Sequence, residues 1–229
     1  MTSRDAAARL IDHTLLRPDV GETDIDALVE EALDLGVFAV CVEGRWVRRI
    51  LDRGAQSLRV VTVCGFPTGE GGPRVKAPEA AWAVGEGADE IDMVADLDAI
   101  RAADWGRVEG DVAEVRAAMD AASAGRVLKV ILETAAFDDR TIVEAALAAE
   151  RGGADFVKTS TGMSPAGGAS VGAVGALNGA VGGRLGIKAS GGIRTAEGAL
   201  ALLDAGATRL GTSGTRQILS GWRVETPPP

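Results

Sequence analysis

The sequence predicts a single-domain α/β protein, a TIM-type (β/α)₈ barrel that spans residues 1–229. Eight short runs rich in Val, Ile and Leu alternate with longer segments of helical periodicity, which is the pattern of parallel βα units. The short runs are almost continuously apolar, as expected of strands that are buried on both faces. No linker or change in composition divides the chain. The predicted strands are residues 9–14, 37–42, 59–64, 89–94, 127–133, 155–160, 185–190 and 208–213.

The segments between these strands have the apolar spacing of helices. Within residues 24–35, apolar side chains recur along one helical face at Ile25, Leu28, Val29, Ala32 and Leu33. The further predicted helices are residues 78–85, 108–122, 141–151, 171–180 and 196–205. Three helix ends share a Gly-Ala step before the next strand, at residues 87–88, 153–154 and 206–207. Glycine suits the left-handed position that ends a helix, so these steps mark repeated helix-to-strand joints.

Eight such units favour a closed barrel over an open, doubly wound sheet. The turn after the first strand also lacks the Gly-x-Gly-x-x-Gly fingerprint of open sheets that bind dinucleotides. The last residues, about 224–229, end in three prolines and are expected to form a short disordered tail.

Composition excludes several classes of partner. The formal net charge is −9, so nucleic acid, which requires a basic face, is not an expected partner. No apolar run approaches the ~20 residues that span a membrane, and the N-terminus lacks the apolar segment of a signal peptide, so a cytoplasmic location is expected. Cys41 and Cys64 lie within apolar runs, as reduced core cysteines do.

Lysine is rare in this chain, and its positions are informative. Only four of the 24 basic residues are lysines, and Lys129, Lys158 and Lys188 lie on three consecutive predicted strands. A charged amine there is costly unless it is paired or neutral. One reading is a structural ion pair, for example with Asp92 or Glu133. Three such lysines favour a functional role, because lysine, unlike arginine, can lose its proton and act as a nucleophile.

Two neighbouring lysines are typical of Schiff-base chemistry. Burial and a nearby cation both lower the pKa of an amine, and the neutral amine then attacks a carbonyl. A carboxylate is needed to move protons, and Asp92 is the first candidate, with Asp12 and Glu133 as others. The spacing does not distinguish Lys158 from Lys188 as the nucleophile.

Other chemistry is disfavoured by the same sequence. The single histidine, His13, is expected to be a hydrogen-bonded structural residue. No cluster of His, Cys and carboxylates has metal-ligand spacing, so neither a metal nor another cofactor is expected.

Two glycine-rich turns predict a phosphate site. They follow the seventh and eighth predicted strands, at residues 190–195 and 211–215. Glycine lets the backbone approach a ligand closely, and the loops after these two strands are the usual phosphate site of this fold. Because the whole chain is acidic, local backbone donors would have to hold the anion.

These motifs resemble the deoxyribose-phosphate aldolase family over about residues 9–220. The resemblance rests on Asp-His-Thr-Leu-Leu at residues 12–16, Glu-Ile-Asp-Met-Val at 90–94, Lys-Thr-Ser-Thr-Gly at 158–162 and Lys-Ala-Ser-Gly-Gly-Ile-Arg-Thr at 188–195. Gly-Phe-Pro at 65–67 and Leu-Lys-Val-Ile-Leu-Glu-Thr at 128–134 add to it. The pair of lysine motifs is quite specific.

The resemblance implies reversible cleavage of 2-deoxy-D-ribose 5-phosphate to D-glyceraldehyde 3-phosphate and acetaldehyde. It implies that Lys158 forms the Schiff base, that Lys188 tunes its pKa and relays protons, and that Asp92 assists that relay. The residues implied at the phosphate are Gly162, Gly191, Gly192, Ser213 and Gly214. Supporting roles are implied for Asp12, Thr14, Cys41, Lys129 and Thr161. The expected partners are a small phosphorylated sugar and acetaldehyde and, since the family is often dimeric, a second copy of the chain in a homodimer.

Some features depart from the family pattern, and rival functions stay open. The chain has no tyrosine, whereas some members place a C-terminal tyrosine near the site. The loop at residues 69–79 is unusually rich in Gly and Pro, and Met163 follows the first lysine motif. The rivals are another lysine-dependent aldolase, a phosphosugar isomerase or epimerase, and a non-catalytic module that binds phosphosugars.

Overall fold

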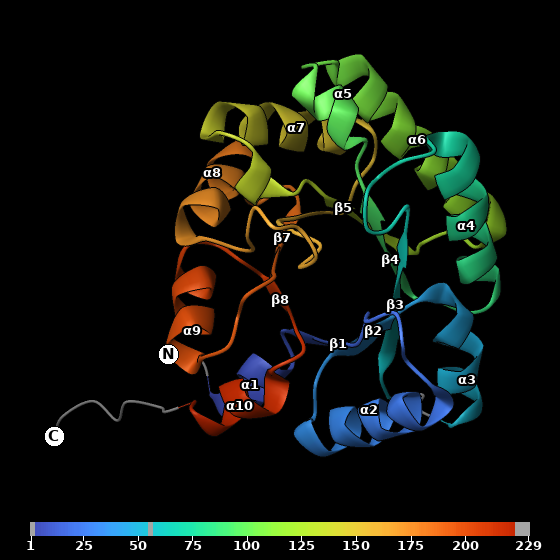
Figure 1. Ribbon diagram of the computed structural model, residues 1–229, viewed down its shortest axis with the longest axis vertical. Helices are drawn as coiled ribbons and strands as arrows, with labels where there is room; N and C mark the ends of the chain where they lie inside the picture. The colour runs from blue at the N-terminus through green and yellow to red at the C-terminus, as the bar shows by residue number, and fades with distance from the viewer. Residues whose placement is uncertain (1–2, 55–56, 223–229) are drawn as a thin grey trace, which may run out of the picture.

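The computed structural model describes residues 3–54 and 57–222 as one closed barrel. Its eight strands follow one another in chain order, all neighbours are parallel, and β8 pairs with β1. Figure 1 shows the strands inside a ring of helices. The predicted (β/α)₈ barrel is therefore confirmed. The tail predicted at residues 224–229 lies outside the described residues.

All eight predicted strands are present, and most are one or two residues shorter than expected at one or both ends. The difference is ordinary, because the hydrogen-bonded ladder ends before the apolar run does. The strands are β1 Ile11–Thr14, β2 Ala39–Val42, β3 Arg59–Cys64, β4 Glu90–Val94, β5 Val127–Ile131, β6 Phe156–Lys158, β7 Gly186–Ser190 and β8 Arg209–Thr212.

The six predicted helices are also present. They are α2 Glu22–Leu35, α4 Pro73–Gly85, α6 Trp105–Ala122, α7 Asp139–Arg151, α8 Val171–Val181 and α9 Ala196–Asp204. Six further short elements were not expected, since each has too few residues for a periodic pattern to emerge. They are α1 Arg4–Ala8, α3 Val47–Asp52, α5 Leu97–Arg101, α10 Thr215–Ser220 and the 3₁₀ turns η1 Gly44–Trp46 and η2 Thr134–Ala136.

Helix α4 begins five residues earlier than expected. The sequence predicts its start at Pro78, but Pro73 occupies the first turn and Pro78 lies inside the helix. Proline is well tolerated in a first turn, where its missing N–H has no helical partner. Much of the Gly- and Pro-rich segment at residues 69–79 is therefore helical rather than loop.

The interior of the barrel is divided into an apolar and a charged half. Side chains from β2 and β3, including Cys41, Val61 and Val63, pack with Leu16 in a small cluster separate from the main core between strands and helices. Both cysteines are buried and free, as predicted. The strands β1 and β4 to β8 instead carry buried charged side chains. These are Asp12, Glu90, Asp92, Lys129, Lys158, Lys188 and Arg209. The fold thus concentrates its buried charge on one side.

Glycines permit the tight joints of the barrel. Gly87, Gly153 and Gly206 have φ of 105°, 90° and 117°, so the predicted left-handed helix ends are confirmed. At Gly186 in β7, a Cβ atom would overlap the ring of Phe156 in β6. Two adjacent strands can therefore approach there only because residue 186 has no side chain.

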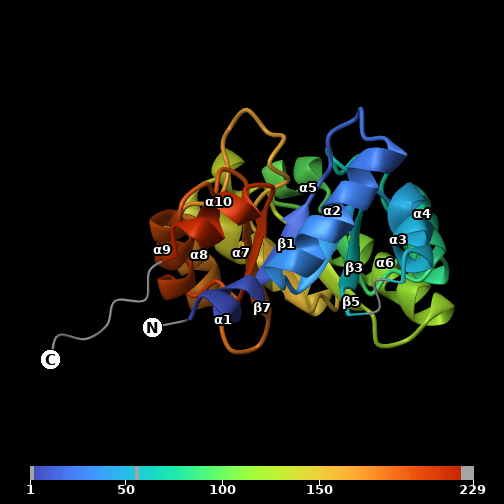
Figure 2. The ribbon, with the colours of Figure 1, turned by 90° about the horizontal axis from the view of Figure 1, so that it is seen from below.

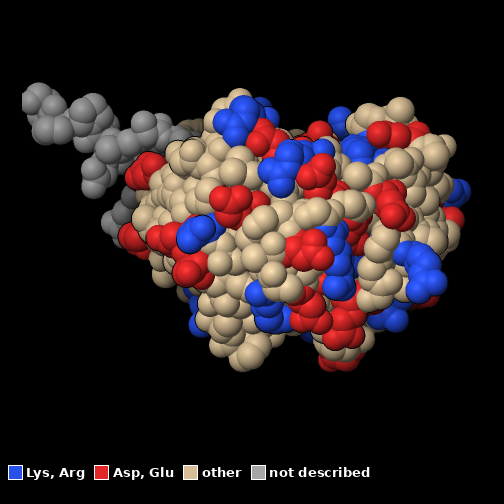
Figure 3. Space-filling model, turned by 90° about the horizontal axis from the view of Figure 1, so that it is seen from above, with Lys and Arg blue, Asp and Glu red and all other residues tan. Residues whose placement is uncertain are grey.

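The surface carries closely mixed charges. Figure 3 shows Lys and Arg interspersed with Asp and Glu across one face of the molecule. Many surface arginines are paired with a carboxylate, as in Arg184 with Glu150 at 2.6 Å and Arg101 with Asp98 at 2.6 Å. Among the helices described, none is long and apolar enough to cross a membrane.

We expect Gly186→Ala to lower the free energy of unfolding by about 1–3 kcal/mol, because the new methyl group must displace the Phe156 ring. Gly175→Ala is the matched control: residue 175 lies in α8 with open space around it, and alanine there should stabilise the helix by about 0.5–1 kcal/mol. Urea unfolding of both variants measures the two changes. Equal stability of the two variants would show that the contact between β6 and β7 does not require glycine.

Candidate active site

A cavity of about 510 Å³ opens at the carboxyl ends of the strands. Its walls come from the loops that follow β1, β6, β7 and β8. Figure 2 shows the loops after β1 and β6 standing on the same side of the barrel. In (β/α)₈ barrels the chemistry takes place at this end. The cavity therefore contains the region in which the sequence predicts catalysis.

Lys158 is the charged residue that reaches this cavity from inside the barrel. It is the last residue of β6, only 3% exposed, and lies in register with Lys188 on β7. Of the charged side chains inside the barrel that the structure describes, Lys158 alone lines the cavity. Lys188, Lys129 and Asp92 are fully buried beneath it.

Asp92 connects the three lysines. Its Oδ2 accepts hydrogen bonds from Lys158 Nζ and from Lys188 Nζ, both at 2.7 Å. Its Oδ1 accepts one from Lys129 Nζ at 2.7 Å. Lys188 also donates to Asp12. The structure thus brings together the three predicted catalytic residues, and places the supporting residues Asp12 and Lys129 against them.

The network separates the pKa values of the two candidate nucleophiles. Burial lowers the pKa of Lys158, Asp92 opposes that effect, and the neighbouring Lys188 charge adds to the lowering. Burial also disfavours the charge on Lys188, but Asp12 and Asp92 together outweigh it and raise the pKa of Lys188. Asp92 stays ionised because the three lysines overcome the effect of burial and hold its pKa well below the ordinary value. Lys158 is accordingly the amine that loses its proton more readily.

Two further charged residues, which the sequence did not single out, lie at the amino ends of the strands. Arg209, the first residue of β8, donates to Asp12 at 2.8 Å and to Glu90 at 3.1 Å. Glu90, the first residue of β4, also lies 2.6 Å from Lys129 Nζ. The signal that could have found them is the two-residue alternation of a strand, since Glu90 shares a face with Asp92.

The predicted phosphate residues all line the cavity together. They are Gly162, Gly191, Gly192, Ser213 and Gly214. Gly214 has already used its N–H, which donates to Thr212 Oγ1 at 2.9 Å.

The glycines also let the loops after β6 and β7 touch. A Cβ on Gly191 would lie 3.0 Å from Gly168 Cα and 3.3 Å from Gly162 Cα, so three glycine backbones meet here. Packing is therefore a second reason for glycine at these positions, beside any ligand.

Arg194 is a further residue on the wall of the cavity. Within residues 3–54 and 57–222 it forms no ion pair, whereas Arg17, which also lines the cavity, is paired with Asp19 and Asp24 at 2.7 Å each. The sequence predicts that backbone donors hold the anion, and this side chain is a donor that the glycine pattern does not reveal. Arg194 supplies a positive charge that is free for a ligand.

Glu133 does not form the ion pair with a strand lysine that the sequence allowed; Lys129 pairs with Asp92 and Glu90 instead. Glu133 Oε2 accepts from Thr161 Oγ1 at 2.7 Å and from Thr161 N at 3.2 Å. Glu133 has φ of 51°, an uncommon value for a residue with a side chain. The carboxylate thereby fixes the start of the loop after β6, directly beyond Lys158. Thr14 and Thr161 line the cavity, as expected of supporting residues.

Cys41 lies beneath the cavity rather than in its wall. It is fully buried in the apolar half of the barrel, and burial raises the pKa of its thiol. The thiol is consequently protonated near neutral pH.

His13 has the structural role that the sequence predicts. Its Nδ1 lies 2.8 Å from Thr215 Oγ1, and its Nε2 lies 3.5 Å from Glu31. Burial lowers the pKa of the ring, although Glu31 opposes that effect. The fourth lysine, Lys76, is buried against Asp111 at 2.6 Å, away from the other three.

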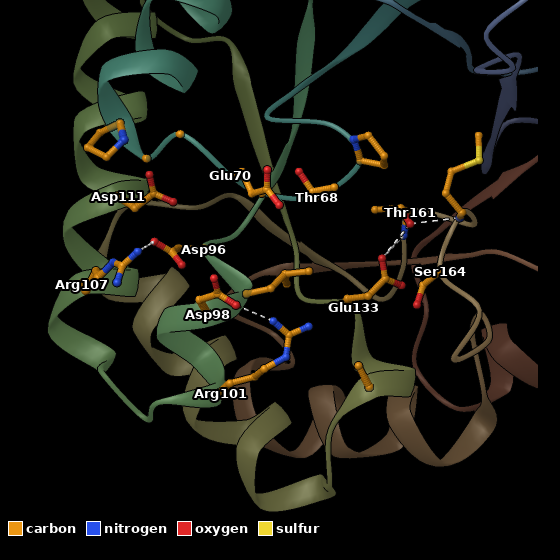
Figure 4. Close-up of a pocket in the computed structure, with 18 of the residues that line it drawn as sticks. Thr68, Glu70, Asp96, Asp98, Arg101, Arg107, Asp111, Glu133, Thr161 and Ser164 are labelled. Carbon is orange, nitrogen blue, oxygen red and sulfur yellow. Dashed lines mark hydrogen bonds and ion pairs between the residues drawn. The ribbon is translucent and has the colours of Figure 1, made fainter.

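A second cavity of about 820 Å³ adjoins the first. The two share Thr161 and Met163. Figure 4 shows its polar wall, where Arg101 faces Asp98 and Arg107 faces Asp96. These pairs neutralise Arg101 and Arg107, whereas Arg74 in the same wall has no ion pair among the described residues. No lysine lies in this wall. The smaller cavity, which contains Lys158, is therefore the candidate active site.

Comparisons with known proteins agree with this geometry. Residues 6–221 match the family described as DeoC/LacD family aldolase. A deoxyribose-phosphate aldolase of Mycobacterium avium is 55% identical over 96% of this chain and 98% of its own length. One of Corynebacterium diphtheriae is 51% identical, with the same coverage.

Solved structures extend the agreement to the backbone. The deoxyribose-phosphate aldolase of Aeropyrum pernix, described as a tetramer, is 33% identical, with a TM-score of 0.87. The match covers 95% of this chain and 91% of that one. The chain belongs to the DeoC/LacD family of aldolases, among the deoxyribose-phosphate aldolases.

Proposed function

We propose that the chain cleaves 2-deoxy-D-ribose 5-phosphate reversibly to D-glyceraldehyde 3-phosphate and acetaldehyde, through a Schiff base on Lys158. The observation that carries the proposal is the position of Lys158. It lies at the floor of a cavity that also contains two glycine-rich turns, and burial lowers its pKa. We further propose that the protein is a single-domain cytoplasmic enzyme and that it forms a homodimer.

The neutral amine starts the reaction. Lys158 Nζ attacks the C1 carbonyl of the open-chain sugar, and loss of water leaves a protonated imine. The C3 hydroxyl then gives up its proton, and the electrons of the C2–C3 bond move into the imine to form an enamine. Glyceraldehyde 3-phosphate leaves with C3. Protonation of the enamine at C2 and hydrolysis of the imine release acetaldehyde and restore Lys158.

Asp92 and Lys188 handle the protons in this scheme. Both lysines donate to the same Asp92 oxygen, so a proton can pass between their amines through a single carboxylate. Before the reaction Lys188 is protonated, and its positive charge lies next to the amine of Lys158. This arrangement favours the neutral form of Lys158 before attack.

The phosphate is proposed to lie against the turns after β7 and β8. Gly162, Gly191, Gly192, Ser213 and Gly214 line that part of the cavity, and Arg194 adds a positive charge. Anchoring the phosphate there would place the aldehyde end of the sugar toward Lys158, at the floor. An isomerase or epimerase would require an acid and base pair in the same place, and would leave the lowered pKa of Lys158 without a use.

Lys158→Arg is expected to reduce turnover on the order of 10³-fold or more, because arginine cannot lose its proton and form the imine. The ion pair with Asp92 can persist, so the fold should be retained. The assay is cleavage of 2-deoxyribose 5-phosphate together with thermal unfolding. Lys76→Arg, at a buried ion pair outside the site, is the control and should keep its turnover. Substantial activity in Lys158→Arg would refute the assignment of the nucleophile.

Lys188→Leu is expected to raise the pKa of Lys158, because Asp92 then serves Lys158 and Lys129 alone. Less neutral amine is present at a given pH, so the rising limb of kcat/KM against pH moves to higher pH. A shift of one unit lowers the rate on that limb about tenfold. Lys188→Arg keeps the charge and should leave the limb near its wild-type position. An unmoved limb in the leucine variant would contradict the tuning role.

Arg194→Ala is expected to raise KM for 2-deoxyribose 5-phosphate about tenfold, because a charge-assisted contact with the phosphate is lost. Activity on unphosphorylated 2-deoxyribose should change little. Arg74→Ala removes another arginine without an ion pair in the described chain, from the wall of the second cavity, and should leave both substrates unaffected. Equal KM values for the two variants would place the phosphate elsewhere.

A further inference from the structure

The charged groups inside the barrel form a closed ring. Six side chains alternate in sign around it, and each contacts the next: Asp92, Lys129, Glu90, Arg209, Asp12 and Lys188, which returns to Asp92. Lys129 Nζ lies 2.6 Å from Glu90 Oε2 and 2.7 Å from Asp92 Oδ1. The contacts of Arg209 with Asp12 and Glu90 are 2.8 and 3.1 Å long. The ring thus runs from the floor of the active site to the opposite end of the barrel.

We propose that Arg209 and Glu90 are positioning residues of the aldol reaction: they close this ring and, with opposite signs, set how far Asp92 compensates the charge of Lys158. Among the described cations inside the barrel, Lys158 alone contacts a single carboxylate, which it shares. The inference rests on the proposed function, since it concerns the same nucleophile. Neither residue touches the cavity, so both act through their neighbours.

The inference rests on the ion-pair partners of each buried cation. Each of the three ring cations, Lys129, Arg209 and Lys188, bridges two carboxylates, and each ring carboxylate bridges two cations of the ring. The ring is therefore neutral in itself. Lys158 is a seventh member with one contact, to an Asp92 oxygen that Lys188 already shares. A buried charge with so little compensation is the one that is removed most easily.

The surroundings of Lys158 agree with its lack of an unshared carboxylate. The groups that face it are Asp92, Lys188 and Cys41, and the thiol of Cys41 is neutral near pH 7 because burial raises its pKa. Burial and Lys188 outweigh Asp92, so the pKa of Lys158 falls. For Arg209, Asp12 and Glu90 outweigh burial, so its pKa rises and its charge is permanent.

Arg209 is held rigidly at the far end. Its guanidinium lies 3.8 Å from the ring centroid of Phe38 and 5.5 Å from that of Phe156. The side chain is only 8% exposed. These aromatic contacts shield the guanidinium from water and hold Arg209 against both of its carboxylates, Asp12 and Glu90.

The two residues should act in opposite directions. Without the charge of Arg209, Asp12 draws Lys188 more strongly, Asp92 is freer to stabilise protonated Lys158, and the pKa of Lys158 rises. Without the charge of Glu90, Lys129 draws more strongly on Asp92, which then stabilises protonated Lys158 less, and the pKa of Lys158 falls. A purely structural role would lower stability in both cases without this difference in sign.

The experiment is the pH dependence of imine formation. Acetaldehyde and cyanoborohydride are added to the wild type, Arg209→Met, Glu90→Gln, the double variant and Arg209→Lys, and the reduced adduct on Lys158 is followed by peptide mass spectrometry. Relative to the wild type, the midpoint should rise in Arg209→Met and fall in Glu90→Gln, each on the order of one pH unit. The double variant, which is again neutral, and Arg209→Lys, which keeps the charge, should lie near the wild type.

Midpoints that coincide, or that move in the same direction in both single variants, would overturn the inference. If the wild type itself forms no adduct on Lys158, the proposed function fails instead, so the two failures are distinct. Should Arg209→Met not fold, the downward shift in Glu90→Gln and its reversal in the double variant decide the matter. Should neither single variant fold, Lys129→Met replaces Arg209→Met, because it removes a cation from the same ring, and the same rise in the midpoint is required.

Discussion

Burial of charge inside the barrel is the constraint on which the site depends. Four cations lie there, and isolated charges in an apolar interior are too costly to persist. Three carboxylates, Asp12, Glu90 and Asp92, compensate three of the cations through paired contacts. The fourth cation, Lys158, has no carboxylate that it does not share, and it lies where the interior opens to the cavity. The same electrostatics that stabilise the interior therefore leave one amine ready to lose its proton.

The fold provides this arrangement through ordinary barrel geometry. Parallel strands with a two-residue alternation direct side chains from β1, β4, β5, β6, β7 and β8 to one side of the interior, while β2 and β3 fill the other with apolar groups. Gly211 on β8 leaves room for Lys188, since a Cβ there would lie 2.9 Å from Lys188 Cε. At the open end, contacts among Gly162, Gly168 and Gly191 bring two loops over the lysines. Packing and chemistry thus rely on the same few positions.

Much of the fold and of the candidate site could be predicted from the sequence. The features that could not be predicted have physical reasons. The strands were visible because they are buried on both faces, and the lysines because they interrupt apolar runs. The short helices α1, α3, α5 and α10 were missed, since six or fewer residues show no period. The choice of Lys158 over Lys188 depends on how many carboxylates each amine contacts, which strand spacing does not show. Arg209 resembled the many surface arginines of this chain until its contacts were seen.

The most direct measurement is the titration of the lysine amines themselves. With only four lysines, a sample labelled with ¹³C at Cε yields few resonances, and the Lys158→Arg variant assigns the one that matters. Lys158 is predicted to titrate below the ordinary lysine value of about 10.4, while Lys188 remains protonated through that range. A Lys158 that titrates at or above the ordinary value, or a Lys188 that loses its proton first, would contradict the role of the buried charges in activating Lys158.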